Sequence, residues 1–527
     1  MITEFVGAIA LGQKVTDTIR GGVFSLEPFL DSPGTLILAM VIAEAGSSIW
    51  LTGCTHLGFP VSTTQSLVGA LIGVGIALQL HVKWDWEKNS VSQIAASWGI
   101  APCIAAGFGA IIMLSIRFFV HSRKDPLKAA IIAIPFYYAA TAAILALFIV
   151  ISGGHGIPTI KEMGAGMVCG IVFGVFAGVW LISVLFFVPY FRAKLIKEDR
   201  RLRVWHLPMG PLLWRDNYTL YLPGKERAEV VKDYYANDYK STDDSSSDRS
   251  LGKSANVPGS GDASGPFKTT ETEPAEKNVN DDGQALDHDA RVQAAHDTKR
   301  QKDLAAVDSL PWAHPKRIFA TLKLIVTYGM TRDVIGHQSR GLEEVHARAP
   351  QFDNKVEHLW TTAQVTSAMI MSIAHGANDI SNAIGPFTTE YVTWSRGETL
   401  AKSDTPTWIK AVGGLTLGVG FLTFGYHMMR NLGNRITKHS PTRGFAMELA
   451  AAITVLLATH FGLPVSTTQC ITGAIVGVAL TNWDLKSINW KQLGKIFIGW
   501  CLTVSRIAPE YVSCLLLTRR CRSLPPV

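Results

Sequence analysis

Long apolar runs are the feature that most limits what this chain can fold into. They occupy residues 36–51, 96–119, 129–151 and 164–188 in the first part and 412–429, 446–460 and 493–517 in the second. A helix needs about 20 predominantly apolar residues to cross a bilayer, so these runs predict several membrane-spanning helices. The composition agrees, because 17% charged residues is well below the roughly 25% of soluble domains. A disordered chain and a soluble enzyme are both disfavoured.

Charged residues gather in one block, at 192–357, where acidic and basic side chains are equal in number. The net charge of +7 therefore belongs to the two apolar parts, where we interpret it as positive-inside loops rather than a nucleic-acid surface. The block contains DDSSSD and PGSGDASGP, which are typical of disordered segments. We predict a transmembrane repeat at 1–191, a hydrophilic, largely disordered cytoplasmic loop at 192–357, and a second transmembrane repeat at 358–527.

The two apolar parts contain an internal repeat. GFPVSTTQ at residues 58–65 returns as GLPVSTTQ at 462–469, and Glu44 and Glu448 precede the two copies by the same distance. Two membrane halves with the same motif are typical of transporters built from structural repeats.

Basic loops indicate the orientation of the two copies. The loops at 122–128 and 192–203, and the one around Arg430, are rich in Lys and Arg, which marks the cytoplasmic side. Counting crossings from these loops puts the first PVSTT on the cytoplasmic side and the second on the outer side. This count predicts inverted repeats.

Each PVSTTQ copy has the pattern of a helix start. In the first copy, Ser62 is the expected N-cap and Gln65 the third residue of a capping box. A helix that starts at membrane depth presents unpaired N–H groups and a partial positive charge, and three hydroxyls add donors. One copy alone would favour simple capping. Two copies favour a pair of helix ends that converge on one tetrahedral oxyanion.

A second motif, HGANDISNAIGP, lies at 375–386 in an apolar segment. We expect its glycines and Pro386 to interrupt a spanning helix. An ionisable residue in lipid is costly and by default functional, although an Asp that caps a kinked helix is the alternative. The motif offers hard oxygen ligands suited to Na⁺, or a proton relay, from Asn378, Asp379 and Asn382.

Two carboxylates, Glu44 and Glu448, lie inside apolar runs. A buried carboxylate needs a cation, a basic side chain or a proton as its partner. We expect this pair to balance Na⁺ or to carry H⁺, and a structural contact between helices is the alternative. No nucleophile–base constellation and no CxxC pair is present, so we predict neither enzymatic activity nor a bound cofactor.

Taken together, HGANDISNAIGP, the doubled GxPVSTTQ motif and the long central loop resemble the inorganic phosphate transporter (PiT) family, and most nearly fungal sodium-dependent phosphate symporters. The resemblance covers nearly the whole chain outside the loop. It implies an all-α polytopic membrane protein with two inverted repeats and broken or re-entrant half-helices. The implied activity is symport of inorganic phosphate by alternating access, with Na⁺ as the coupling ion.

The resemblance also assigns residues. The hydroxyl motifs match the family's phosphate site at Ser62, Thr63, Thr64, Ser466, Thr467 and Thr468. Asp379 matches a residue that serves both phosphate and Na⁺. The further Na⁺ ligands that we expect are Asn378, Asn382, Glu44 and Glu448. Glu4, like Glu44 and Glu448, matches a membrane glutamate that the family needs for transport.

Two features depart from the family. GAND occurs in both family halves but only once here, and residues 4–12 resemble the family's second helix, so we expect the first helix to be missing. After residue 504 the family continues with Pro and an apolar helix, whereas this chain has Ser505-Arg506 and a basic end.

Several alternatives stay open at this stage. H⁺-coupled transport of phosphate, or transport of sulfate, would use the same kind of site. A non-transporting phosphate receptor or sensor is a further alternative. The expected partners are inorganic phosphate, Na⁺ or H⁺, the lipid bilayer and an optional second copy in a homodimer, with no nucleic acid. We expect a multi-pass protein of the plasma membrane.

Overall fold

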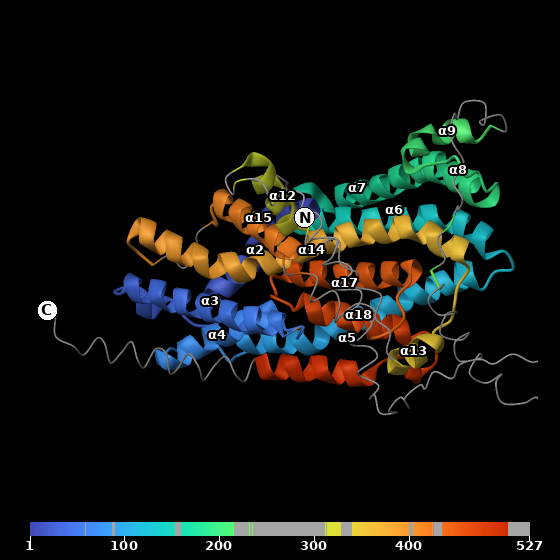
Figure 1. Cartoon of the computed structure of the whole chain (residues 1–527). Helices are drawn as coiled ribbons and strands as arrows, with labels where there is room; N and C mark the ends of the chain where they lie inside the picture. The colour runs from blue at the N-terminus through green and yellow to red at the C-terminus, as the bar shows by residue number, and fades with distance from the viewer. Residues whose placement is uncertain are drawn as a thin grey trace, which may run out of the picture.

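The computed structural model describes residues 1–57, 59–86, 90–152, 160–215, 231, 234–235, 311, 314–327, 340–399, 404–423, 425 and 435–503. These residues are almost entirely helical (Figure 1), and the β contact found among them is one isolated bridge between Phe24 and Val82. The predicted all-α class is confirmed.

The first part of the chain forms the helices α1 (Ile2–Leu11), α2 (Gln13–Gly21), α3 (Pro33–His56), α4 (Thr63–Ala77), α5 (Val91–Ile116), α6 (Pro126–Ser152), α7 (Ile160–Ile182), α8 (Val188–Phe191) and α9 (Gly210–Leu213). The second part forms α12 (Pro315–Thr327), α13 (Arg340–Ala347), α14 (Asn354–Arg396), α15 (Thr407–Thr423), α17 (Pro441–Phe461) and α18 (Thr467–Leu480). Residues 490–503 are also helical.

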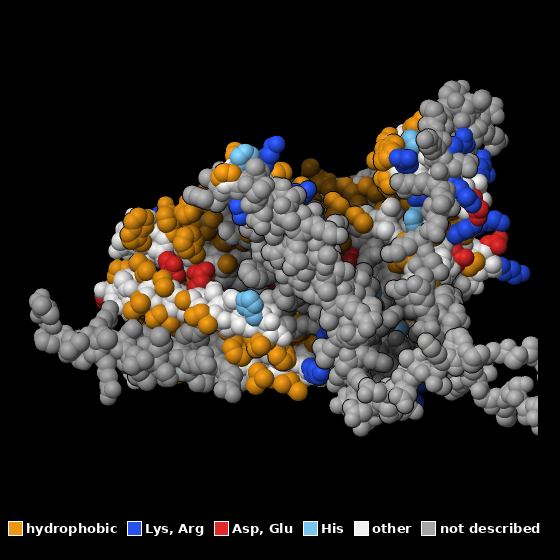
Figure 2. Space-filling view, in the orientation of Figure 1, with side chains coloured by type: hydrophobic (Ala, Val, Ile, Leu, Met, Phe, Trp, Pro, Cys, Tyr) orange, Lys and Arg blue, Asp and Glu red, His pale blue; other side chains and the backbone are white. Residues whose placement is uncertain are grey.

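Five helical stretches among the described residues are long and apolar enough to cross a membrane. They are Pro33–His56, Val91–His121, Pro126–Ile151, Gly164–Ile196 and Pro441–Phe461. Helices α4, α15 and α18 are apolar but shorter. Apolar side chains also cover outward faces of the molecule, whereas Lys and Arg side chains gather at the end that carries α8 and α9 (Figure 2). This distribution fits a helical bundle surrounded by lipid.

Helix α14 is continuous over 43 residues, about 64 Å at 1.5 Å per residue. Asp353 caps its start by accepting hydrogen bonds from the N–H groups of Lys355 and Val356. It ends at Gly397, whose φ of 72° suits glycine. The expected interruption at the glycines and Pro386 is therefore wrong.

The glycines of α14 serve helix packing instead of breaking the helix. A Cβ atom on Gly376 would lie 2.2 Å from the carbonyl oxygen of Glu4 in α1. A Cβ atom on Gly385 would lie 2.9 Å from the side chain of Ile19 in α2. These residues are glycine because α1 and α2 approach the α14 backbone too closely for a side chain.

Two helical hairpins reach the middle of α14 from its opposite ends (Figure 1). Helix α17 begins beside the start of α14, where Glu357 accepts hydrogen bonds of 2.9 and 3.0 Å from Thr442. Helix α3 follows Phe29, whose carbonyl accepts a bond of 2.9 Å from Thr399, just beyond the end of α14. Each hairpin turns back at its PVSTT segment, so α4 and α18 start near the middle of α14.

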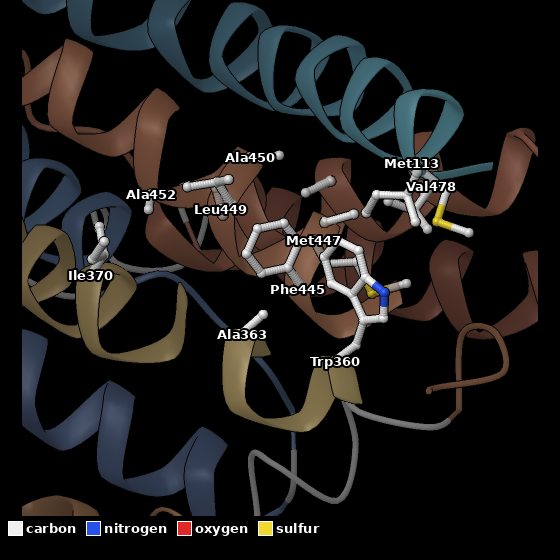
Figure 3. Close-up of a cluster of buried hydrophobic side chains, with 14 of the residues drawn as sticks. Met113, Trp360, Ala363, Ile370, Phe445, Met447, Leu449, Ala450, Ala452 and Val478 are labelled. Carbon is white, nitrogen blue, oxygen red and sulfur yellow. The ribbon is translucent and has the colours of Figure 1, made fainter. Parts of the chain in front are cut away.

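The main hydrophobic cluster lies between α14, α17, α5 and α18 (Figure 3). Trp360 of α14 packs against Phe445 of α17, with ring centroids 5.0 Å apart, and against Tyr137 of α6 at 4.9 Å. Helix α18 crosses α5 in backbone contact, because a Cβ atom on Gly477 would lie 2.0 Å from the carbonyl oxygen of Ala106. This core fixes the second hairpin against the first part of the chain.

Tyr234 and Tyr235, in the central block, pack against the start of α14. Tyr235 is 3% exposed. Its hydroxyl donates to Oε1 of Glu357 at 3.3 Å and accepts from the N–H of Phe352 at 3.1 Å. The N–H of Tyr234 donates to Oδ1 of Asn354 at 3.2 Å. The block is thus attached where α14 begins.

Helices α12 and α13 lie in the last third of the central block. The segments DDSSSD and PGSGDASGP lie outside the described residues. So do the loop around Arg430 and the sequence after residue 503.

Candidate functional site

Both PVSTTQ copies start a helix as the sequence predicted. The Oγ of Ser62 accepts a hydrogen bond of 3.2 Å from the N–H of Gln65, and the Oγ of Ser466 accepts one of 3.3 Å from Gln469. Both serines are therefore N-caps, of α4 and α18. The reciprocal bond of a capping box is not formed, because the side-chain oxygens of both glutamines are buried without a hydrogen-bond partner among the described residues.

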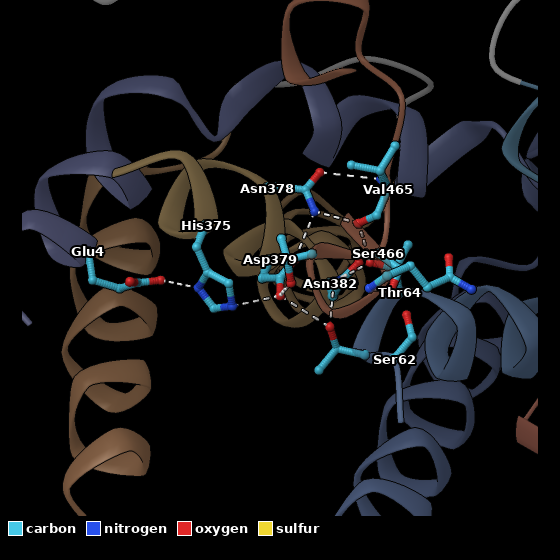
Figure 4. Close-up of polar contacts among 12 residues, drawn as sticks. Glu4, Ser62, Thr64, His375, Asn378, Asp379, Asn382, Val465 and Ser466 are labelled. Carbon is cyan, nitrogen blue, oxygen red and sulfur yellow. Dashed lines mark hydrogen bonds and ion pairs between the residues drawn. The ribbon is translucent and has the colours of Figure 1, made fainter. Parts of the chain in front are cut away.

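The carboxylate of Asp379 joins the two copies (Figure 4). Its Oδ2 atom accepts a hydrogen bond of 2.9 Å from the hydroxyl of Thr467 and a longer one of 3.4 Å from Thr63. The two threonines occupy the same place in the two copies. Asp379 is 9% exposed, so the two helix starts meet at one buried anionic group near the middle of α14.

Asn378 holds the second copy against α14. Its side-chain nitrogen donates at 2.7 Å both to Oδ1 of Asp379 and to the carbonyl oxygen of Val465. Its side-chain oxygen accepts from the N–H of Val465 at 3.4 Å. A fully buried amide with all of these contacts fixes the turn before α18.

Asn382 does the same for the first copy. Its side-chain nitrogen donates to the hydroxyls of Thr63 and Thr64 at 3.2 and 3.0 Å. Thr64 in turn donates to the carbonyl of Val465 at 3.1 Å, which links the two copies directly. The side-chain oxygen of Asn382 is buried without a hydrogen-bond partner among the described residues. This oxygen is therefore suited to a further ligand such as a cation.

The predicted residues are not all in one place. Ser62, Thr63, Thr64, Ser466 and Thr467 lie with the GAND residues. Thr468 is half-buried on the first turn of α18, and its hydroxyl makes none of the hydrogen bonds described above. The structure brings the two helix starts together but does not join Thr468 to Asp379.

Glu44 and Glu448 lie apart from Asp379, beside other parts of α14. Glu448 accepts hydrogen bonds from Ser367 at 2.7 Å and from Gln364 at 3.3 Å, three and four turns before Asp379. Glu44 lies near Glu390, about three turns after Asp379. One carboxylate oxygen of Glu390 is buried without a hydrogen-bond partner among the described residues. The two glutamates therefore flank the central site along α14.

His375 is a site residue to which the sequence analysis gave no role. Its Nε2 atom lies 2.9 Å from Oδ2 of Asp379, and its Nδ1 atom contacts Oε1 of Glu4. The spacing offered a signal, because residues four apart share a helix face. The contact to Glu4 is a tertiary one, which no local pattern predicts.

The central site offers hydrogen-bond donors for an anion and oxygen ligands for a cation side by side. The first turns of α4 and α18 provide N–H groups without intrahelical partners, the positive ends of two helix dipoles and several hydroxyls. Asp379 and the amide oxygen of Asn382 provide hard oxygen ligands. No cluster of three or more His, Cys, Asp or Glu suited to a tightly held metal occurs in the described part of the chain.

The fold and site define a class of protein. Membrane helices that surround paired half-length helices, whose starts meet at a buried polar site, are the architecture of secondary transporters. The family model described as "Phosphate transporter family" matches residues 1–508. This chain belongs to the phosphate transporter family.

Individual relatives agree with this assignment. The phosphate-repressible phosphate permease pho-4 of Neurospora crassa is 37% identical over 521 residues, which cover 95% of this chain and 87% of the relative. The sodium-dependent phosphate transporter 2 of Bos taurus is 28% identical over 576 residues, which cover 95% of this chain and 88% of the relative. A solved structure, titled "The sodium-dependent phosphate transporter", superposes with a TM-score of 0.61. The match covers 98% of this chain and 88% of the chain in that structure. At 21% identity, this match establishes the fold alone.

Proposed function

We propose that this protein is a symporter that moves inorganic phosphate across a membrane together with Na⁺. Its family is that of phosphate transporters, and the names of several relatives specify sodium dependence. The observation that carries the proposal is the meeting of Thr63 and Thr467, from the two motif copies, at one oxygen of Asp379.

Phosphate binding would use the two helix starts. The O–H groups of Thr63 and Thr467 can rotate about their C–O bonds, so each can donate to a phosphate oxygen instead of to Asp379. Ser62, Thr64 and Ser466 are their neighbours in the two motif copies (Figure 4), and Thr468 on the first turn of α18 would add a further hydroxyl. A tetrahedral anion held between two positive helix ends needs no basic side chain.

Na⁺ would offset the charge of this arrangement. Asp379 and a bound phosphate would place like charges a few ångströms apart in a medium that solvates charge poorly, at a large electrostatic cost. A cation on Asp379, with amide oxygens of Asn378 and Asn382, removes that cost. Each cargo then raises the affinity for the other, which is the thermodynamic basis of coupling. Glu44 and Glu448 would hold further cations at the two flanks.

The opposed hairpins support an inverted-repeat mechanism. Residues 1–191 and 358–527 would form the two repeats, joined by the cytoplasmic block at 192–357. Because the hairpins α3–α4 and α17–α18 extend from opposite ends of α14, rocking of one against the other would expose the shared site to each side in turn. The plasma membrane is the expected location.

A direct test is uptake of ³²P-labelled phosphate by proteoliposomes that contain the purified protein. Na⁺ and pH are varied separately, with K⁺ replacing Na⁺ at constant ionic strength. The proposal predicts uptake that requires Na⁺ and is competed by excess phosphate but not by sulfate. Uptake driven by a pH gradient without Na⁺ would indicate H⁺ coupling instead. Phosphate binding without any flux would indicate a receptor.

A further inference from the structure

A line of three side chains connects α1 to the central site. Glu4 of α1 contacts Nδ1 of His375, and Nε2 of His375 lies 2.9 Å from Oδ2 of Asp379 (Figure 4). Glu4 is 2% exposed although it carries a carboxylate. A buried carboxylate is retained only where a polar partner compensates its loss of water, and the partner here is the imidazole.

The helices are built to bring these residues together. A Cβ atom on Gly7 would lie 2.1 Å from the carbonyl oxygen of Ile373, and one on Gly376 would lie 2.2 Å from the carbonyl oxygen of Glu4. Helices α1 and α14 therefore cross in backbone contact one turn before Asp379. This close crossing brings the carboxylate of Glu4 to the ring of His375.

A second contact holds α1 on the other side of Asp379. Ser381 donates to the carbonyl of Gly12, between α1 and α2, at 2.9 Å. Thr16 donates to the Oγ of Ser381 at 3.0 Å. Helix α1 is thus fixed to α14 both before Asp379, through Glu4, and after it, through the carbonyl of Gly12.

From this geometry we propose that His375 is a positioning residue that, held by Glu4, fixes the carboxylate of Asp379. The imidazole contacts Oδ2 from one side. The side of that atom that faces Thr63 and Thr467 stays open to cargo. Glu4 then acts on cargo binding through His375 and not as a direct ligand of Na⁺. The inference rests on the proposed function, because it explains how the site for Na⁺ and phosphate is kept in shape.

A double-mutant cycle distinguishes the two possible roles of Glu4, as a direct ligand of Na⁺ or as a support for His375. Four proteins are compared: the wild type, Glu4→Ala, His375→Ala and the double variant. We measure the Na⁺ concentration for half-maximal phosphate uptake in proteoliposomes, normalised to the protein inserted. Each single substitution is expected to raise that concentration about tenfold, the effect of losing one charge-assisted hydrogen bond. Maximal uptake per inserted molecule is expected to change much less.

The double variant decides between the roles. If Glu4 acts through His375, the double variant matches His375→Ala within about twofold, because the two residues form one unit. If the losses multiply to about a hundredfold, Glu4 acts independently and the proposal is overturned. The proposal is also overturned if either single variant has the wild-type Na⁺ concentration for half-maximal uptake.

Two further variants test whether the hydrogen bond to Asp379 matters and whether any histidine change on α14 has the same effect. His375→Gln keeps a side-chain nitrogen that can donate to Asp379, and it is expected to restore most of the Na⁺ affinity that His375→Ala loses. An equal loss in both variants would contradict a positioning role. His358→Gln changes a histidine on the same helix that contacts Tyr234 instead of the site, and it should leave the Na⁺ dependence unchanged.

Failure of the proposed function would show separately. If the wild type has no Na⁺-dependent uptake, the symport proposal fails. The same variants are then compared by equilibrium binding of ²²Na⁺ and ³²P-phosphate to the purified protein. Binding losses in the same pattern would support positioning without transport. Wild-type affinity for both ions in His375→Ala would overturn the positioning role.

Discussion

Thr63 and Thr467 donate hydrogen bonds to the same atom, Oδ2 of Asp379, at 3.4 and 2.9 Å. They hold equivalent positions in two helix starts that approach from opposite ends of α14. One carboxylate therefore marks the point where the two motif copies meet. The functional consequences of this geometry can be tested residue by residue.

The first prediction is that both copies contribute to phosphate binding. Thr63→Val and Thr467→Val keep the side-chain shape but remove the hydroxyl, so each should raise the phosphate KM about three- to tenfold by losing about one hydrogen bond. Serine at either position should retain most of the affinity. Thr416→Val on α15, whose hydroxyl bonds only to its own helix, is the control. A normal KM in either threonine variant would contradict a shared site.

The second prediction concerns the crossing of α5 and α18. Gly477→Ala would place a Cβ atom 2.0 Å from the carbonyl oxygen of Ala106, so the helices must separate at a cost of about 1–3 kcal/mol. We expect a lower melting temperature of the detergent-purified protein. Gly178→Ala on α7, where a Cβ atom meets nothing within 4 Å, should leave it unchanged. Equal melting temperatures of the two variants would argue against this crossing.

The third prediction compares two buried tyrosines, each 3% exposed. Tyr235→Phe removes a hydroxyl that bonds to Glu357 and to the N–H of Phe352, and it should destabilise the protein by about 1–3 kcal/mol because those groups lose a partner. Tyr190→Phe removes a hydroxyl without a hydrogen-bond partner among the described residues. It should be neutral or slightly stabilising. A reversed order would show that Tyr235 is not docked against α14.

The local features of the site could be predicted from sequence, and the tertiary ones could not. The N-cap role of Ser62 follows from a pattern of adjacent residues, and the structure confirms it. The expected break of the GAND helix was wrong, because glycines in a membrane helix can serve close packing as well as flexibility. Sequence alone cannot separate these uses, since the answer for Gly376 depends on where α1 passes.

Contacts between residues far apart in the chain were the hardest to predict from the sequence. Glu44 and Glu448 were named with Asp379 as expected Na⁺ ligands, and the structure places them beside Glu390 and Ser367. Equal spacing reports the symmetry of two repeats and not a common contact. The role of His375 was missed for a similar reason, because its second partner, Glu4, is 371 positions away.

The most direct test of the central claim is the Asp379→Asn variant in proteoliposomes with an imposed inward Na⁺ gradient. Asparagine keeps the shape of the side chain and can still accept the bonds from Thr63 and Thr467, but it lacks the charge that would hold Na⁺. We predict that the wild type accumulates ³²P-phosphate only with Na⁺, and that an equal amount of inserted Asp379→Asn protein does not. Wild-type Na⁺-dependent accumulation by this variant would contradict the account.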